Sequence, residues 1–488
     1  MMEKQHTGGD GRKYFGTALL CAAVAVLIVL NVILNALASR FGWYLYTEET
    51  YSHTIGDASH AVLDEVPEGE EIRVIFCMPE EELLGDVIYA LVLNTFRQLA
   101  ERHDFITIEF ANIYLNPGAV RPYRVRTLAT GETVEYPITE QSVIIASAER
   151  EDDFRVEALQ SFFILNAKQV ITAYNGEEIA ISCLAWVLED SHPVAAFTTG
   201  HGENYAELSA FYTVLLAAGY DISVLTLDEE IPEGVGLVVI ANPRWDLDRG
   251  AAGSGVDAEL DRLADFLDDG GSLFVSLDPY AKADLSGIRA FLLERGLSAT
   301  QEVIRDPGNS ITPDGYTLVT EPSGSPLSDT LFDRIGTYTA ARAVVREASV
   351  IHCESRGAWQ ASPLLSTSAT AEAFVGGERV DADGPYPVLA ASRTESGATV
   401  ILASSVYLLA GDALNSSTYA NRDVIMASLE LTADRTTPVG CRILAVNNTM
   451  LEDLTMRVAR VYAILLTLVL PLAVAAVGAV RIIRRKNR

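Results

Sequence analysis

The chain has 488 residues, of which 49% are hydrophobic, and its formal net charge is −30. Such an acidic surface repels phosphate backbones, which excludes nucleic acid as a partner. The five cysteines are widely spaced and form no C-x-x-C pair, which excludes a zinc ribbon and a thioredoxin-type redox centre.

Two uncharged apolar runs lie near the ends of the chain, at 15–37 and 461–480. A helix of about 20 residues crosses the hydrocarbon of a bilayer, so each run is predicted to span a membrane once. Basic residues flank the runs on their terminal sides, with Arg12 and Lys13 before the first and a basic tail at 481–488 after the second. The positive-inside rule then predicts a two-pass plasma-membrane protein with both termini in the cytoplasm and a large extracytoplasmic domain.

The membrane segments also carry signals for processing and for helix contacts. Ala36-Leu37-Ala38 is similar to a signal-peptidase site, but the apolar run is longer than that of a signal peptide, which favours a retained anchor. Candidate contacts with a neighbouring membrane helix are Asn31, Asn35, Pro471, Ala475 and Ala479. For the two asparagines, hydration at the outer interface is the alternative.

The element pattern predicts a modular organisation along the chain. The predicted segments are a cytoplasmic tail at 1–13, a transmembrane helix at 14–38, a small α/β domain at 45–185, a larger α/β domain at 190–435 with a β-rich insertion at about 301–388, a linker at 436–459, a second transmembrane helix at 460–480 and a basic cytoplasmic tail at 481–488.

The small domain begins with a buried strand at 72–76, which a helix at 87–101 follows. Strands at 105–110 and 142–147 come next, the first alternating between apolar and polar residues as a strand with one wet face does. This β-α-β-β order predicts a small α/β domain, for which a thioredoxin-like topology is one candidate.

The larger domain alternates strands with helices. A continuous apolar strand at 194–198 has the pattern of a strand covered on both faces. Further strands are predicted at 222–225, 237–241 and 272–277, with amphipathic helices between them. This alternation predicts a doubly wound parallel sheet. After about residue 301 short β-like runs replace the alternation.

In a parallel α/β sheet, ligands bind beyond the carboxyl ends of the strands. The residues predicted at these ends are Thr199, Gly200, His201, Gly202, Glu203, Asn242 and Asp278. Glycines let the backbone approach a ligand closely, and a histidine two residues from a glutamate could bind a metal or transfer protons. The alternative is that this segment is only a tight turn between a strand and a helix.

Signals for covalent catalysis and for nucleotide hydrolysis are missing from the sequence. It contains no G-x-S-x-G elbow and no G-x-x-x-x-G-K-[ST] phosphate loop. We therefore expect no enzyme activity and no cofactor. Two other functions stay open, which are a cell-surface hydrolase that uses His201, Glu203 and Asp278, and a ligand-sensing ectodomain.

The order of features resembles the gliding-motility, GldG-like family of auxiliary proteins in ABC-2-type transport systems. The resemblance is carried by TEETYSHT at 47–54, by FTTGHGE at 197–203 with the segments 219–221, 238–243 and 267–273, and by VILASS at 400–405 before a helix containing Asn421. Relatives tend to read Gly-Asp-Ser where this chain reads Ala403-Ser404-Ser405, so a ligand role for that loop is not implied.

The resemblance implies a glutamine-amidotransferase-like fold without the catalytic cysteine of those enzymes. It also implies a non-enzymatic extracytoplasmic subunit that works beside an ABC permease and a cytoplasmic ABC ATPase, with the lipid bilayer around its anchors.

Overall fold

The structure is a computed structural model that describes residues 54–64, 66, 69–166, 168–205, 208–247, 258–280, 284–335, 341–416, 418–433, 437–441 and 443–445. The predicted membrane segments, both tails and the helix-contact candidates Asn31, Asn35, Pro471, Ala475 and Ala479 lie outside the described residues. Across the described ranges, no helix is both long enough and apolar enough to cross a membrane.

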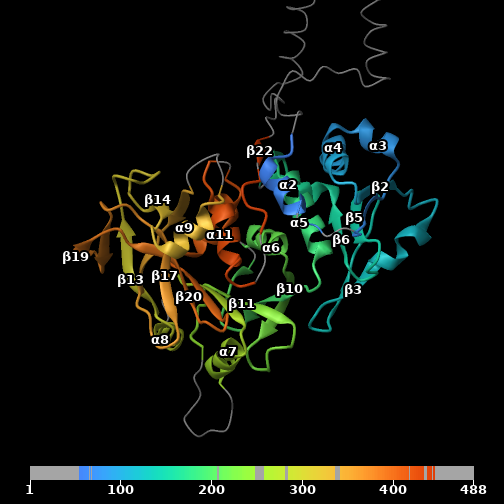
Figure 1. The fold of residues 1–488 in the computed structure, drawn as a ribbon. Coiled ribbons are helices and arrows are strands. Elements are labelled where there is room, and N and C mark those ends of the chain that lie inside the picture. Colours follow the sequence, from blue (N-terminus) through green and yellow to red (C-terminus); the bar gives the residue numbers. More distant parts are fainter. Residues whose placement is uncertain are drawn as a thin grey trace, which may run out of the picture.

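The N-terminal unit is built around a four-stranded sheet (Figure 1). Its helices and strands are α2 (Asp57–Asp64), β1 (Ile72–Phe76), α3 (Glu80–Gly85), α4 (Val87–Arg102), β2 (Ile106–Phe110), η2 (Pro117–Arg124), β3 (Val125–Thr127), β4 (Thr133–Glu135), β5 (Ser142–Ser147), β6 (Phe154–Ala158), η3 (Leu159–Phe162), β7 (Phe163–Leu165), β8 (Ile171–Tyr174) and α5 (Gly176–Leu188).

The sheet of this unit has the order β2-β1-β5-β6. β1 pairs in parallel with β2 and antiparallel with β5, which pairs antiparallel with β6. Side chains of a strand alternate between faces, so Val74 and Phe76 join the core under α4 and α5, while Ile75 joins a smaller core on the other face. The predicted strands at 72–76 and 142–147 are confirmed, as is the helix that begins at Val87.

The C-terminal unit holds a nine-stranded sheet and the helices that cover it. Its elements are β9 (Val194–Thr199), α6 (Ser209–Ala217), β10 (Asp221–Thr226), β11 (Val235–Ala241), α7 (Glu259–Asp268), β12 (Ser272–Ser276), α8 (Ser286–Glu294), β13 (Leu297–Arg305), β14 (Thr317–Pro322), α9 (Pro326–Phe332), β15 (Ala343–Arg346), β16 (Ser349–Cys353), β17 (Gln360–Ser366), β18 (Glu372–Val375), β19 (Glu378–Asp383), β20 (Pro387–Arg393), β21 (Thr399–Ala403), η5 (Val406–Leu409), α10 (Gly411–Leu414) and α11 (Asn421–Leu429). The last described strand, β22 (Leu444–Ala445), returns to the N-terminal unit, where it pairs antiparallel with β8.

The α/β fold is confirmed, but the large sheet is mixed rather than parallel throughout. Its strand order is β10-β9-β11-β12-β21-β20-β17-β14-β15. The strands from β10 to β21 pair in parallel, whereas β20, β17, β14 and β15 extend the sheet with antiparallel pairs. The antiparallel strands come from the region after residue 301, where short hairpin-like runs replace the alternation of strand and helix that parallel pairing requires.

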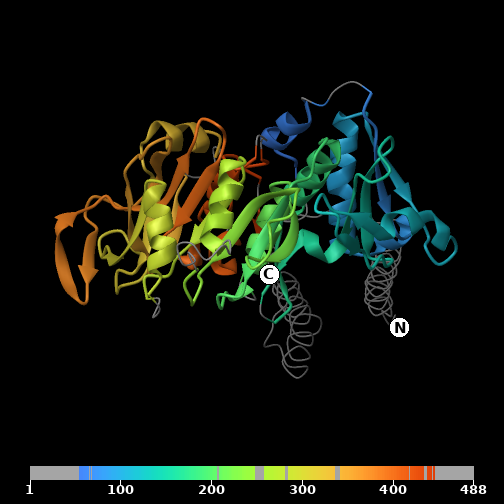
Figure 2. The same cartoon turned by 90° about the horizontal axis from the view of Figure 1, so that it is seen from below.

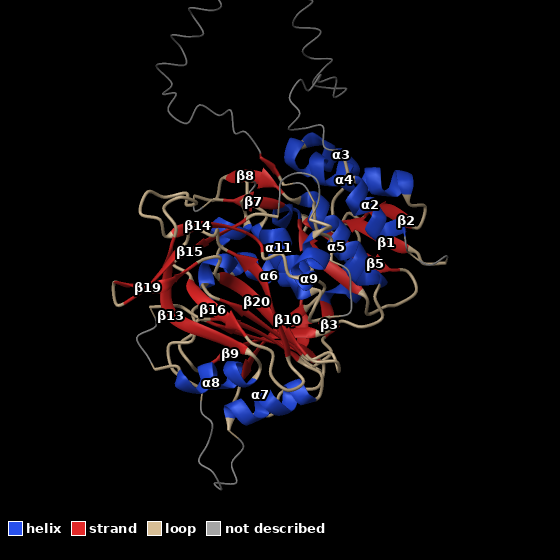
Figure 3. Cartoon of the chain, turned by 60° about the vertical axis from the view of Figure 1, so that its left-hand side comes forward, coloured by secondary structure: helices blue, strands red, loops and turns tan. Residues whose placement is uncertain are grey.

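Helices cover both faces of the large sheet. Phe197 and Val239 pack on α6, α9 and α11, while their neighbours Ala196 and Val238 pack on α7 and α8 (Figure 3). The burial of both faces explains why these strands are continuously apolar. A second sheet, with the order β16-β13-β18-β19, lies at the end of the unit far from the N-terminal unit, and β19 is at its edge (Figure 2).

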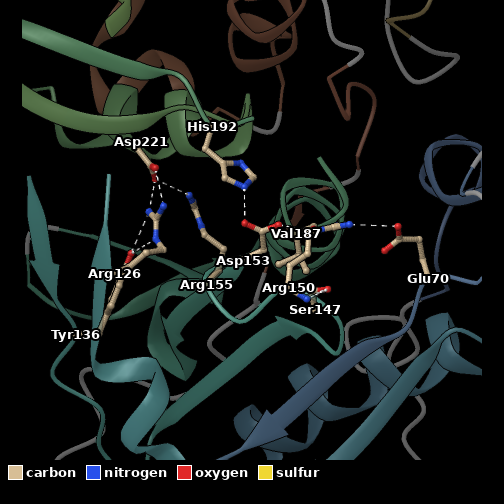
Figure 4. A network of polar contacts seen from close by, with 10 residues as sticks. All are labelled: Glu70, Arg126, Tyr136, Ser147, Arg150, Asp153, Arg155, Val187, His192 and Asp221. Carbon is tan, nitrogen blue, oxygen red and sulfur yellow. Dashed lines mark hydrogen bonds and ion pairs between the residues drawn. The ribbon is translucent and has the colours of Figure 1, made fainter. Parts of the chain in front are cut away.

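One junction between the two units is formed where Asp221 of the edge strand β10 meets two arginines of the N-terminal unit (Figure 4). Arg126 of β3 donates to Asp221, its Nη1 lying 2.8 Å from Oδ2, and Arg155 of β6 places Nη1 3.7 Å from Oδ1 of the same carboxylate. Both guanidinium groups lie over the ring of Trp186 in α5, at 4.6 and 5.2 Å from its centroid. The ring of His192 stacks on Trp186 at 3.5 Å.

A second junction joins α5 to α6 and α11. Arg422 of α11 donates through Nε to both carboxylate oxygens of Glu178, at 2.7 and 2.6 Å, and through Nη1 to Thr213 of α6 at 3.3 Å. Glu178 and Arg422 are both buried, although they lie 244 residues apart in the chain. Two charges removed from water need this close pairing, because either one alone would remain unpaired in the core.

The Arg422→Ala variant is expected to lose about 3–5 kcal/mol of unfolding free energy, because it leaves Glu178 buried without its partner. The matched control is Arg342→Ala, since Arg342 pairs with Glu321 on the surface, where both side chains are more than half exposed. The control should lose less than about 1 kcal/mol. Chemical denaturation of the full-length protein in detergent measures the unfolding free energy of both variants. Equal losses would contradict a larger contribution of the buried pair to stability.

Candidate functional site

The candidate site lies at the point where the chain changes direction across the large sheet. From β9 the chain passes to β10 on one side, and then to β11 on the other side of β9. Ligands of open α/β sheets bind at such a switch point, beyond the carboxyl ends of the strands. The predicted residues 199–203 follow β9, Asn242 follows β11 and Asp278 follows β12.

His201 is the centre of a buried charged cluster. Its Nε2 lies 3.0 Å from Oε1 of Glu259, the first residue of α7, and its Nδ1 lies 3.7 Å from Oε1 of Glu203. The backbone N–H of His201 also donates to Glu203, at 2.8 Å from Oε2. The imidazole is therefore held between two carboxylates from different parts of the chain, an arrangement we call the His201 cluster.

Further hydrogen bonds attach this cluster to the neighbouring loop and strand. The carbonyl oxygen of His201 accepts from the backbone N–H groups of Arg244 and Trp245, at 2.7 and 3.0 Å. Thr198 of β9 donates through Oγ1 to Oε1 of Glu203 at 2.9 Å. The loop after β9 is thus fixed to the loop after β11 and to the start of α7.

The charges of the cluster stabilise one another. Contact with Glu203 raises the pKa of His201 above its ordinary value, against the opposing effect of burial, and Glu259 acts in the same direction. Burial alone would raise the pKa of Glu203, but its bonds with His201, Thr198 and the backbone lower the pKa below its ordinary value. Because the imidazole of His201 is already in contact with two carboxylates, this geometry is better suited to holding loops together than to general-base catalysis.

Two glycines of the predicted site occupy left-handed backbone conformations. Gly200 has φ +118° and Gly202 has φ +76°. A Cβ atom at Gly202 would lie 2.7 Å from Cζ3 of Trp245 and 3.0 Å from Cβ of Arg244, whereas a Cβ at Gly200 would meet nothing within 4 Å. Gly202 is therefore required both by its φ angle and by the close approach of Trp245.

The other predicted residues do not join the His201 cluster. Thr199 donates through Oγ1 to the carbonyl of Leu225 at 3.4 Å, and Asn242 has a positive φ of 51°. Asp278 accepts from the backbone N–H of Tyr280 at 2.8 Å. No hydrogen bond or ion pair among the described residues connects Asp278 with His201 or Glu203. The convergence of three side chains that the hydrolase hypothesis requires is therefore not among the described contacts.

Glu259 and Trp245 belong to the site but were not predicted. Glu259 opens a helix, so in sequence it has the pattern of an ordinary acidic first turn, and its contact with His201 spans 58 residues. Trp245 and Tyr280 are exposed aromatic residues, 61% and 54% accessible, that follow β11 and β12. An apolar side chain just beyond a strand end is the signal that could have marked them.

The described residues provide neither a reactive thiol nor a cluster of metal ligands. Cys77, Cys183, Cys353 and Cys441 are free thiols, and burial raises the pKa to about 11 for Cys77 and to about 12 for Cys183 and Cys353. Thiols with such pKa values are poor nucleophiles at neutral pH. In the same described ranges, no group of three or more histidine, cysteine, aspartate or glutamate side chains is arranged to hold a metal ion.

No family model matches the chain, and no curated protein matches it. Similar solved structures include the mmIFT52 N-terminal domain, at 18% identity and a TM-score of 0.37, covering 49% of this chain and 97% of that one. PurLQS from Thermotoga maritima is 14% identical, with a TM-score of 0.24 and coverage of 43% and 85%. A protein from Thermoplasma acidophilum described as a GMP synthase subunit is 11% identical, with a TM-score of 0.27 and coverage of 50% and 96%.

The Gly202→Ala variant should displace the ring of Trp245, while Gly200→Ala, its matched control, should not. Both place a Cβ at positive φ, at a cost of about 1–3 kcal/mol. The measurement is tryptophan emission of the folded proteins, with Trp245→Phe to identify the contribution of that ring. Identical spectra for the two glycine variants would show that the contact does not determine the position of Trp245.

The stability of the protein should depend on pH through His201. Because the folded pKa of His201 is raised above its ordinary value of 6.5, its stabilising effect is fully present below that value. The effect is lost as the pH rises through the folded pKa. In His201→Gln the fall in unfolding free energy above pH 6.5 should be smaller than in the native protein, while His352→Gln on the exposed surface should retain it. Parallel pH profiles for all three proteins would contradict this role.

Proposed function

We propose that this protein is a membrane-anchored accessory subunit of an ABC-type transport system, similar to the GldG-like auxiliary proteins. In this proposal it has no catalytic activity of its own, and its ectodomain acts at the outer face of a permease whose ATPase lies in the cytoplasm. The observation that carries the proposal is that both ends of the described chain meet at one end of the molecule.

The meeting of the chain ends is built from specific contacts beside α5. Glu177 accepts from the backbone N–H of Gly56 at 2.8 Å and from Oγ of Ser59 at 2.5 Å. Ser59 also lies 3.4 Å from Sγ of Cys441, which belongs to the last described residues. α2 and β22 accordingly lie side by side at the top of the view in Figure 1. The apolar runs at 15–37 and 461–480 both connect to this end, so two anchors would enter one membrane face from it.

The strand orders support two finer folds, one that the resemblance implies and one that the order of elements in the N-terminal unit predicts. The parallel order β10-β9-β11-β12-β21 is the one we propose to be glutamine-amidotransferase-like, with the antiparallel strands as its extension. The order β2-β1-β5-β6 in the N-terminal unit is the one we propose to be thioredoxin-like. Cys77 directly follows β1 but is buried with a raised pKa, which argues against a redox role for that unit.

In the proposed orientation, one end of the ectodomain lies near the membrane and the other end, with the His201 cluster, lies far from it. The His201 cluster contacts the start of α7, which lies at the end of the molecule opposite α2 and β22 (Figures 1 and 3). With anchors at the α2 end, the switch point would face away from the membrane. The surface nearest the bilayer would instead be formed by the N-terminal unit, where a permease could be reached.

Affinity purification of the full-length protein in mild detergent tests this proposal. We expect an ABC permease and its ATPase to co-purify from cells that express such a system. The matched control replaces the apolar run at 461–480 with an unrelated membrane helix of the same length, and this variant should retain less permease if that run docks on it. Recovery of the chain without any ABC subunit from such cells would overturn the proposal.

A further inference from the structure

An exposed apolar surface lies on the N-terminal unit where α3 ends and α4 begins. Leu84 is 49% accessible, Val87 45% and Ile88 38%. Tyr114 and Leu115, in the loop after β2, are still more exposed, at 75% and 84%. We call these five residues the α3–α4 patch. Scattered apolar residues are ordinary on a protein surface, but a contiguous group marks a place of contact.

Electrostatic contacts show that the loop and the helices of the patch are neighbours. Interaction with Glu140, and more weakly with the charge of Glu82 in α3, raises the pKa of the Tyr114 hydroxyl above its ordinary value. Burial raises the pKa of Tyr89 in α4, and the charges of Asp86, at the junction of the two helices, and of Glu140 raise it further. The loop with Tyr114 and Leu115 therefore borders the same surface as the α3–α4 junction.

The border of the α3–α4 patch is acidic. Glu81, Glu82 and Asp86 are exposed around the α3–α4 junction, and Glu140 lies on the loop side. Glu80 is the acidic residue of α3 that is already paired, because Arg97 of α4 forms an ion pair with it. The exposed carboxylates around an apolar centre produce a negative potential that selects a positively charged partner.

The α3–α4 patch lies at the same end of the molecule as the two ends of the described chain. α3 and α4 lie at the same end of the molecule as α2 and β22, in two views that differ by a rotation (Figures 1 and 3). An anionic bilayer surface is repelled by the acidic border, so insertion of the patch into lipid is disfavoured. A protein surface with apolar side chains inside a basic border matches both features.

We propose that the α3–α4 patch is a docking surface for a protein partner that presents apolar side chains surrounded by lysine or arginine. The placement of this partner at the membrane rests on the proposed function, whereas its chemistry rests on the patch alone. The partner buries Leu84, Val87 and Leu115 against its apolar centre, and its basic side chains pair with Glu81 and Glu82. These pairs orient the complex and accelerate its formation.

Site-specific photocrosslinking in intact cells tests the docking surface with the full-length chain. A photoreactive residue at position 87 is compared with one at position 375, because Val375 on β18 has a similar accessibility of 48% and lies outside the patch. The crosslinked peptide is mapped by mass spectrometry. We expect a protein crosslink at position 87, absent at position 375, within a segment of net positive charge.

Charge reversal supplies the second arm of the test. Glu81→Lys combined with Glu82→Lys should lower the crosslink yield at position 87 at least about fivefold, as expected when complementary charges become repulsive. Asp268→Lys combined with Asp269→Lys, two exposed acids at the end of α7, makes the same change in net charge elsewhere and should leave the yield unchanged. Equal yields in both variants would overturn the proposal.

Other crosslinking outcomes contradict the proposal directly. A crosslink only to lipid, to a second copy of this chain or to an acidic segment would exclude the stated partner, as would no crosslink at all. A crosslink to a basic protein that is not part of an ABC system would uphold the docking surface and count against the proposed function. Co-purification of a permease without a position-87 crosslink would uphold the function and remove the docking surface.

Discussion

Two adjacent buried carboxylates at the start of α5 connect three separate parts of the chain. Glu177 holds the N-terminal segment through Gly56 and Ser59, and Glu178 binds Arg422 of α11. The carboxylates lie in the first turn of a helix, where the macrodipole favours negative charge, and hydrogen bonds from their partners replace the lost water. Without these two carboxylates, the N-terminal segment and α11 of the C-terminal unit would each lose a buried contact with α5.

The same arrangement determines what each surface of the molecule can do. Because the first and last described segments meet beside α5, both apolar runs connect to one end of the ectodomain. The α3–α4 patch is near that end, and the His201 cluster is next to α7 at the other. The cluster joins its own loops through a histidine that contacts two carboxylates. The His201 cluster therefore has a structural role, and the α3–α4 patch is the surface that we propose to bind a partner.

Local patterns in the sequence predicted the elements far better than their pairing. The apolar run of β1 and the periodicity of α4 are properties of neighbouring residues, and both elements were found where they were predicted. The β-rich region after residue 301 was predicted, but its antiparallel pairing within the large sheet was not, because that pairing joins residues far apart in the sequence, such as Glu321 of β14 and Ser366 of β17. In the site, His201 and Glu203 could be grouped since they lie in one loop. Glu259, 58 residues away, required the fold itself.

The proposed function depends most on an ectodomain that lies outside the cell while the chain termini lie inside. Labelling of single introduced cysteines with a membrane-impermeant maleimide on intact cells measures this directly. The pair is Val375→Cys on exposed β18 and Asn487→Cys in the basic tail, with the native chain as the blank for its own thiols. We expect labelling of Val375→Cys on intact cells, and of Asn487→Cys only after the membrane is permeabilised. Labelling of Asn487→Cys on intact cells, or protection of Val375→Cys, would contradict the proposed topology.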